Sequence, residues 1–305
     1  MVCALMTRSR LLRLSLFVVA LPLGLSCAAK PVPAEAPREP TPAPQPEESI
    51  ASGDAISPIE AALAGSHREA GNRARDGQRH PQATLSFFGL TPQMTVVELW
   101  PGTGWYTEVL AATIQGHGKL ITTNYDVNAS TDPEDYRVRI GKAFAEKLLS
   151  DPIYEGTEAI TVADPKSFTL APEGSVDLVL TFRSSHGWVA DGTAAAVFGE
   201  AFKALRPGGV LGVVQHRAKA DDTRDPKVLA ETGYVREDHL IEVIESVGFK
   251  LDEKSEINAN AKDTKDYKEG VWTLPPVLAL KEVEQAKYEA IGESDRMTLR
   301  FVKPD

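Results

Sequence analysis

Apolar and polar positions predict a strand, a tight turn and a helix around residue 100. Residues 95–99 form a short apolar run with two β-branched valines, which is typical of a buried strand. The run breaks at residues 101–104, Pro-Gly-Thr-Gly, and residues 106–112 continue with helical spacing. This order is the opening unit of a nucleotide-binding α/β sheet, because glycines let a ligand approach the backbone closely. The helix behind the turn offers free N–H groups to an anionic or polar ligand.

The same alternation continues downstream. Short apolar runs predict further strands at residues 119–126, 158–164, 175–182, 210–214, 249–256 and 296–303. Helical spacing predicts helices between them, at residues 133–149, 191–205 and 236–247. Residues 206–209, Arg-Pro-Gly-Gly, are a strong stop signal after the second of these helices. Strands that alternate with helices predict an open, mostly parallel sheet.

Residues 57–90 also follow a helical pattern. Ser57, Pro58 and Glu60 predict a capped helix start with proline at the first helical position. A charged segment follows, which we interpret as a solvated helix face. The alternative is that part of it lines the mouth of a ligand site, because it directly precedes the first strand. Its members are Arg68, Arg73, Arg75, Asp76, Arg79 and His80.

The first 27 residues predict an export signal. A basic start is followed by twelve uncharged residues, 14–25, which are too few to span a bilayer as a mature helix. They end in Leu-Gly-Leu-Ser-Cys, which resembles a bacterial lipoprotein cleavage box that makes Cys27 the lipidated first mature residue. The alternative is ordinary cleavage near Ala28, with Cys27 lost. We therefore expect an exported protein on the periplasmic side, anchored to a membrane through lipid on Cys27.

Residues 28–55 are rich in proline, alanine and glutamate, with seven prolines between Pro31 and Pro46. Such a composition cannot build a core and favours extended conformations. It predicts a spacer that holds a folded domain, residues 56–305, off a membrane. The alternative is a disordered terminus with no anchoring role.

Composition limits the possible partners. The 305 residues are 42% hydrophobic and 25% charged, which is ordinary for a globular chain. Their formal charge is −10, and it becomes −13 without residues 1–27, which hold three arginines and no acid. Because an acidic protein repels nucleic acid and anionic lipid, we expect a small-molecule partner, no nucleic acid and no membrane contact beyond a lipid anchor. The only cysteines are Cys3 and Cys27, so the folded part has no disulfide and no thiolate metal site.

Two acids end predicted strands. Asp126 ends the second strand 22 residues after Gly104, where an acid is placed to accept hydrogen bonds from ribose hydroxyls. Asp164 ends the third strand in the same way.

With these features the chain, from about Thr84 to Lys303, resembles class I S-adenosylmethionine-dependent methyltransferases. The resemblance implies an α/β, Rossmann-like methyltransferase fold with a seven-stranded, mostly parallel sheet, an antiparallel C-terminal hairpin and helices on both faces. It also implies S-adenosylmethionine as the cofactor. Trp105 and Tyr106, just past the turn, either flank that cofactor or pack into the sheet. The residues that match the family's cofactor-binding positions are Glu98, Gly102, Gly104, Asp126 and Asp164.

More narrowly, the chain is similar to a group of exported bacterial proteins described only as predicted methyltransferases. It departs from the wider family at Trp100, which stands where the first glycine of the turn is normally found. We expect the indole either to point away from the ligand or to reshape the pocket. The strings similar to the narrower group are residues 98–102, 104–108, 233–236, 263–266 and 270–276.

Two histidines are the candidate catalytic residues. Methyl transfer from a sulfonium needs alignment and desolvation, and a base helps when the acceptor is a hydroxyl or a protonated amine. His186 and His216 follow the fourth and fifth strands, so both fall at the ligand-binding edge of a parallel sheet. We predict that they act as bases or substrate contacts. The alternative is that each only satisfies a loop carbonyl.

Three further residues are candidates for substrate contact. Arg183 and Trp188 follow the fourth strand, beside His186. Trp272 belongs to a long insertion, residues 258–295, which is either a lid over the strand ends or a structural flap.

Other chemistries lack their motifs. The six histidines show no tight metal-ligand spacing, and neither a Gly-x-Ser-x-Gly elbow nor a phosphate loop is present. A nicotinamide-binding turn would need a small residue where Thr107 stands. The predicted function is therefore S-adenosylmethionine-dependent methyl transfer to a small molecule, with no metal. Because the cofactor is made in the cytoplasm and the signal points outward, a non-catalytic ligand-binding lipoprotein on the same scaffold is the alternative. A nicotinamide-dependent oxidoreductase is the third hypothesis.

Overall fold

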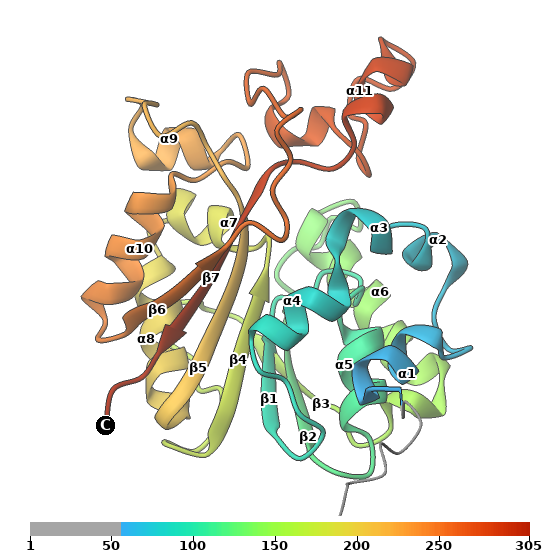
Figure 1. Ribbon diagram of the computed structural model, residues 1–305, viewed down its shortest axis with the longest axis vertical. Coiled ribbons are helices and arrows are strands. Elements are labelled where there is room, and N and C mark those ends of the chain that lie inside the picture. The colour runs from blue at the N-terminus through green and yellow to red at the C-terminus, as the bar shows by residue number, and fades with distance from the viewer. Residues whose placement is uncertain (1–55) are drawn as a thin grey trace, which may run out of the picture. The chain divides into compact units, whose positions relative to one another are not determined.

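A seven-stranded sheet forms the centre of the computed structural model, which describes residues 56–305 (Figure 1). The predicted signal, the linker and Cys27 lie outside the described residues. The strands are arranged in the order β3-β2-β1-β4-β5-β7-β6, and β7 runs antiparallel to both of its neighbours. This confirms the predicted Rossmann-like methyltransferase fold with its C-terminal hairpin. The strands are β1 Thr95–Leu99, β2 Lys119–Tyr125, β3 Glu158–Val162, β4 Val176–Phe182, β5 Leu205–His216, β6 Lys250–Ser255 and β7 Arg296–Val302.

Both faces of the central strands are buried, as a parallel sheet requires. Successive side chains of a strand point to opposite faces, so neighbours enter different core clusters. In β1, Val97 packs into one cluster and Val96 into the other. In β4, Val179 and Leu180 divide in the same way. The continuous apolar runs in the sequence reflect this burial on two sides.

Helices cover the two faces of this sheet. α7, α8 and α10 contribute to the cluster that contains Val97, whereas α1, α4 and α5 contribute to the cluster that contains Val96. None of the helices in residues 56–305 has both the length and the apolar character needed to cross a bilayer. The helices are α1 Pro58–Ala64, α2 Ala70–Arg73, α3 Asp76–Arg79, α4 Pro81–Phe87, α5 Thr107–Ile114, α6 Tyr136–Ser150, α7 Ser185–Ala190, α8 Ala194–Ala204, α9 Pro226–Ala230, α10 Glu237–Ser246 and α11 Gln285–Ile291, with 3-10 turns η1 Pro152–Tyr154 and η2 Gly270–Thr273.

The helix predicted at residues 191–205 differs from the structure. It begins later, as α8, and a separate short helix, α7, precedes it. The stop signal at residues 206–209 lies inside β5, whose first residue pairs with Val176 of β4. The predicted capped start at Ser57 is confirmed, because Ser57 and Glu60 form a reciprocal capping box.

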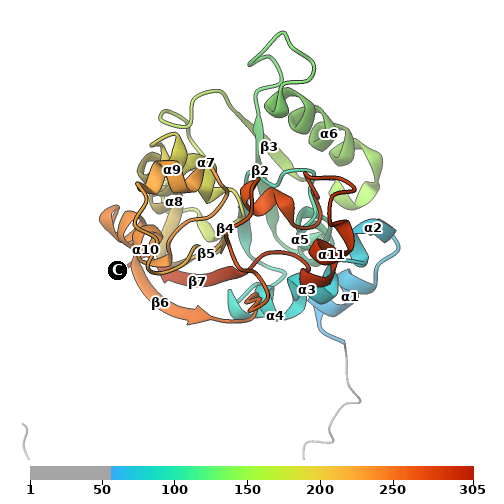
Figure 2. The same cartoon turned by 90° about the horizontal axis from the view of Figure 1, so that it is seen from above.

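Two segments far apart in the sequence cover the carboxyl ends of the parallel strands. Figures 1 and 2 show α2 and α3 at this end of the sheet, with α11 beyond them and close to α3. The two segments are joined through Glu293, which accepts hydrogen bonds from Arg75 and Arg79. The insertion is also fixed at its base, because Asn260 donates to the carbonyl oxygens of Ile291 and Glu293.

Candidate functional site at the carboxyl ends of the strands

The turn after β1 has three residues in the left-handed region of the backbone. They are Trp100 at φ 46°, Gly102 at φ 64° and Gly104 at φ 82°. A Cβ at Gly104 would lie 2.8 Å from Cδ of Lys147, so this position needs glycine for space as well as for φ. A Cβ at Gly102 would meet nothing within 4 Å, which leaves that side of the turn open.

Trp100 adopts its unusual φ because its backbone is held from both sides. Its N–H donates to Oγ1 of Thr123 in β2 at 2.7 Å, and its carbonyl accepts from the hydroxyl of Ser184 at 3.0 Å. A non-glycine residue with positive φ costs about 1 kcal/mol or more, so the surroundings must impose this conformation.

The indole of Trp100 fills the space beyond the end of β1. It is only 4% exposed and packs edge-on against Trp188, Phe168 and Tyr125, with ring centroids 5.0, 5.8 and 6.4 Å away. Trp188, a predicted substrate contact, lies between Trp100 and Phe198 in the core. The indole is therefore part of the core cluster that also contains Val97.

Glu98, a predicted cofactor contact, is completely enclosed at the end of β1. Its side chain accepts a hydrogen bond from the Thr107 hydroxyl at 2.6 Å. Burial raises the pKa of Glu98 from 4.5 to about 8, and the Thr107 bond opposes part of that rise. The carboxyl group is therefore mostly protonated at neutral pH, and its hydrogen bond with Thr107 joins the end of β1 to the start of α5.

The two acids after β2 and β3 lie nearer the surface. Asp126 is half-buried, and one of its oxygens accepts the N–H of Asn128 at 2.9 Å. Its other oxygen has no hydrogen-bond partner within the described residues. Asp164 is exposed and accepts the N–H of Lys166 at 2.9 Å. Asp126 is thus the acid of the two that combines partial burial with a free oxygen.

Trp105 and Tyr106, also predicted cofactor contacts, are both buried. The Trp105 ring lies between the guanidinium groups of Arg68 and Arg79, 5.2 and 4.7 Å from its centroid. Tyr106 stacks on Phe182 at the end of β4, with 3.5 Å between centroids. Their rings attach the N-terminal segment to the sheet.

The interpretation of residues 68–80 as a solvated helix face is wrong for two of its arginines. Arg68 and Arg79 are 3% and 1% exposed. Arg68 forms ion pairs with Asp76 at 2.6 Å and with the fully buried Glu108 at 3.4 Å. The segment lies over the strand ends, and whether it lines a ligand site stays a prediction.

The two candidate histidines are brought together. The ring centroids of His186 and His216 lie 5.9 Å apart, and Trp272 from the insertion stands edge-on to His186 at 5.8 Å. Nδ1 of His216 is hydrogen-bonded to the hydroxyl of Ser294. Burial, and then the charge of Arg183, lower the pKa of His186 from 6.5 to about 4 and that of His216 well below its usual value. Both rings are therefore neutral at pH 7, and each is a weaker base than a free imidazole.

Arg183 stands beside this pair. It follows β4 directly, its φ is 64°, and its N–H donates to the carbonyl of Val214 in β5 at 2.7 Å. Its side chain is partly buried, and no acceptor within residues 56–305 pairs with its guanidinium. Burial lowers the pKa of Arg183.

Glu293 and Arg296 were not singled out from the sequence, although they complete this end of the site. Glu293 accepts from Arg79 Nε at 2.9 Å and from Arg296 Nη1 at 2.8 Å, and all three side chains are at most 4% exposed. The acidic string that precedes the last strand was the available signal. Its partner Arg79 lies 214 residues earlier, which no local pattern reveals.

Unpartnered polar atoms concentrate at this edge of the sheet. Within the described residues, seven buried side-chain atoms have no hydrogen-bond partner, and their residues end β4 or β5, begin α7 or β7, or belong to the covering segments. Buried polar atoms normally have partners, so these atoms leave hydrogen-bonding capacity for water or a polar ligand at this edge. The atoms are Arg79 Nη2, Thr181 Oγ1, Ser185 Oγ, His186 Nδ1, Gln215 Oε1, Asn258 Oδ1 and Arg296 Nε.

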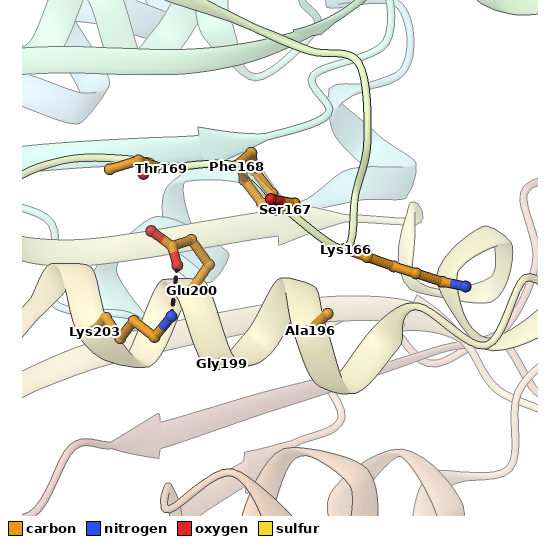
Figure 3. Close-up of a pocket in the computed structure, with 8 residues that line it drawn as sticks. All are labelled: Lys166, Ser167, Phe168, Thr169, Ala196, Gly199, Glu200 and Lys203. Atoms are coloured by element: carbon orange, nitrogen blue, oxygen red, sulfur yellow. Dashed lines mark hydrogen bonds and ion pairs between the residues drawn. The ribbon is translucent and has the colours of Figure 1, made fainter.

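Two hollows lie away from these residues. One, of about 420 Å³, runs between the loop 166–169 and α8 (Figure 3). Phe168 forms part of its wall and also packs on Trp100. The other, of about 320 Å³, lies between the start of α9 and the insertion, with Tyr234 and Lys265 in its wall. Across residues 56–305, no group of three or more histidine, cysteine or acidic side chains is arranged to hold a metal ion.

Comparisons with known proteins concern the fold. No family model matches the chain, and no curated protein matches it in sequence. Among solved structures, a "putative sarcosine dimethylglycine methyltransferase" from Galdieria sulphuraria is 12% identical, covers 78% of this chain and 88% of its own, and has a TM-score of 0.50. An S-adenosylmethionine-dependent methyltransferase from Aquifex aeolicus is 15% identical, covers 75% and 93%, and has a TM-score of 0.49. A geranyl diphosphate methyltransferase bound to S-adenosylmethionine is 14% identical, covers 80% and 94%, and also has a TM-score of 0.49. The chain has the class I methyltransferase fold.

Proposed function

We propose that residues 56–305 transfer a methyl group from S-adenosylmethionine to a small-molecule acceptor. The observation that carries this proposal is the meeting of a glycine turn and two neutral histidines at the carboxyl ends of the strands of a methyltransferase fold. Ligands of open α/β sheets bind at that edge. The concentration of unpartnered polar atoms there supports the same place.

Two features at the ends of β1 and β2 support cofactor binding. Gly102 leaves the turn open, and Asp126 has a free oxygen for a sugar hydroxyl. In this proposal Trp100, which packs on Tyr125 at the end of β2, moves aside when the nucleoside binds.

The chain's own residues would then orient the acceptor and take its proton. The cofactor supplies an activated methyl carbon on a sulfonium. His186 is neutral at pH 7 and takes the proton that a hydroxyl or ammonium acceptor gives up as a weak base, because its pKa of about 4 lies below 6.5. Trp272 covers His186 and excludes water from the acceptor.

Binding of S-adenosylhomocysteine, measured by calorimetry on the purified protein, tests the proposal. We expect micromolar binding that is lost in Asp126→Asn. Asp132→Asn is the matched control, because Asp132 makes the same local bond to the N–H two residues on, at 2.9 Å, in the same loop. Binding of NAD alone would select the oxidoreductase hypothesis.

The packing of Trp100 favours a second candidate, a non-catalytic binding protein on this scaffold. If the indole cannot leave, wild-type protein binds neither S-adenosylhomocysteine nor NAD. Trp100→Gly should then gain S-adenosylhomocysteine binding, and Trp100→Phe, which keeps a ring in place, should not. Micromolar binding by the wild type would exclude this candidate.

Export and lipid anchoring form a separate part of the proposal. They are supported by the basic start, the uncharged run and the cleavage box of residues 1–27. In bacterial cells grown with radiolabelled palmitate, we expect label in the wild type and in Cys3→Ala, and none in Cys27→Ala. Label that persists in Cys27→Ala would refute the anchor.

A further inference from the structure

We propose that the acceptor is a small acid whose oxyanion, a carboxylate or a phosphate, pairs with the guanidinium of Arg183 beside His186 and His216. This names the substrate class and rests on the proposed methyl transfer for its role. The existence of an anion-binding site at Arg183 does not depend on methyl transfer, because it is argued only from the geometry at the strand ends.

The position of Arg183 is fixed, but its charge has no partner. The backbone N–H bond to Val214 holds the residue against β5. No acceptor or acid within the described residues pairs with its side chain, although the side chain is partly buried. Withdrawing a guanidinium from water without a partner is unfavourable, so an anion that reaches it is stabilised by a charge-assisted bond.

The surroundings carry more positive than negative charge. Arg75, Arg79 and Arg296 share the single carboxylate of Glu293, and Arg183 adds a fourth guanidinium. The next carboxylate along the chain, Asp295, is already paired with Arg217 and Lys265, at 3.0 and 2.7 Å. The acids at this end of the sheet therefore leave a positive surplus around Arg183.

Nitrogens of this cluster lack acceptors as well. Nη2 of Arg79 and Nε of Arg296 are buried without a hydrogen-bond partner in residues 56–305. The two arginine side chains are 1% and 4% exposed. Such buried donors raise the local potential, because they keep the full charge of each group while water is excluded.

The expected ligand is small. The formal charge of the whole chain is −10, which opposes the approach of a long polyanion, whereas a compact acid can enter a local positive site. Aromatic rings border the position, since Tyr106 stacks on Phe182 and Trp272 stands against His186. These rings offer an apolar contact to the rest of the molecule.

Binding of the anion also prepares the base. Burial is the largest cause of the low pKa of both histidines, and the charge of Arg183 comes next for each; His186 and Arg296 lower the pKa of His216 further. An oxyanion beside Arg183 cancels part of this charge. The pKa of both histidines therefore rises when the acceptor is bound, which makes them better proton acceptors in the complex.

The test compares matched probes on the purified protein without cofactor. Calorimetry measures benzoate against benzamide, and phosphate against chloride. We expect benzoate or phosphate to bind and benzamide and chloride not to, because a charged hydrogen bond is worth at least about tenfold in affinity. Benzoate alone identifies a carboxylate site and phosphate alone identifies a phosphate site.

Two variants connect the binding to Arg183. Arg183→Gln should weaken anion binding about tenfold or more without lowering the urea midpoint, because the guanidinium has no partner to lose. Arg206→Gln, which removes an exposed arginine paired with Asp177, should bind like the wild type. Equal binding of benzoate and benzamide, or unchanged binding in Arg183→Gln, would overturn the proposal.

The outcome is separable from that of the proposed function. Anion binding by a protein that does not bind S-adenosylhomocysteine keeps this site and removes the methyl transfer. Binding of S-adenosylhomocysteine with no anion binding keeps the transfer and overturns the acidic acceptor.

Discussion

Glu98 is an acid in a place that water does not reach. It is 1% exposed and has one hydrogen-bond donor, Thr107, on the helix that follows the turn. A buried carboxylate with one neutral donor is poorly stabilised, so the proton stays on. The residue therefore connects β1 to α5 as a neutral group under physiological conditions.

This protonation makes stability depend on pH. With a pKa of about 8 in the folded state and about 4.5 unfolded, Glu98 keeps its proton only in the folded chain between those values. Stability contributed by the protonated group is thus lost as pH rises, by about 1.4 kcal/mol per pH unit. His186, with a pKa near 4, has the opposite sign but titrates below pH 6.5.

Urea unfolding between pH 6.5 and 8 isolates the Glu98 contribution. We expect the wild type to lose stability over this range and Glu98→Gln to lose distinctly less. Glu256→Gln, at an exposed acid, is the control and should follow the wild type. Parallel wild-type and Glu98→Gln curves would show that the carboxyl is ionised in the folded protein.

Trp100 combines an unfavourable backbone with favourable packing, and the packing is larger. Replacing a buried tryptophan by a small residue costs about 3–5 kcal/mol, whereas glycine at φ 46° recovers about 1 kcal/mol. Trp100→Gly should therefore lower the free energy of unfolding by about 2–4 kcal/mol in urea titrations. A variant as stable as the wild type would mean that the indole does not fill this space.

For single residues, the sequence predicts which element a residue belongs to better than it predicts where its side chain points. The site of Trp100 in the turn was evident, because the turn is defined by its glycines. The orientation of the indole depends on its packing against Phe168 and Trp188, which become neighbours of Trp100 only when the sheet has folded. Side-chain orientation of this kind is a product of tertiary packing, which a local pattern does not contain.

At the scale of elements, the carboxyl edge is covered by two segments that depend on each other. α3 supplies Arg79, the end of the insertion supplies Glu293, and the first residue of β7 supplies Arg296. The alternation of apolar runs and helices predicted a mostly parallel sheet, and the resemblance to methyltransferases implied the antiparallel C-terminal hairpin. The arrangement of the two covering segments could not be predicted from the sequence. Their charged residues have the local pattern of a solvated surface, and their ion-pair partners lie far away in the sequence.

Removing the shared carboxylate should therefore be costly. Glu293→Gln leaves the buried guanidiniums of Arg79 and Arg296 without a counter-charge, and breaking a buried pair costs about 3–5 kcal/mol. Glu256→Gln breaks a pair with Arg217 whose acid is 67% exposed, and should cost about 1 kcal/mol or less. Urea midpoints compare the two. Similar small losses would indicate that water already compensates the charges at Glu293.

For the whole molecule, stability comes from the two core clusters on either side of the sheet. Both cysteines of the chain, Cys3 and Cys27, precede the described residues, so no disulfide supports the fold. We expect the same urea midpoint with and without dithiothreitol. The measurement on Cys27→Ala serves as the control for disulfides between molecules, and a midpoint that falls on reduction would contradict the prediction.

The place of β7 has a consequence for the making of the protein. β7 lies between β5 and β6 and bonds to both, yet it follows both of them in the sequence, at Arg296–Val302. During synthesis β6 therefore has no neighbour until β7 has been made, and the bonding edge of β5 stays open for the same time. A chain that stops before β7 would leave both edges exposed, a form that proteases and aggregation remove.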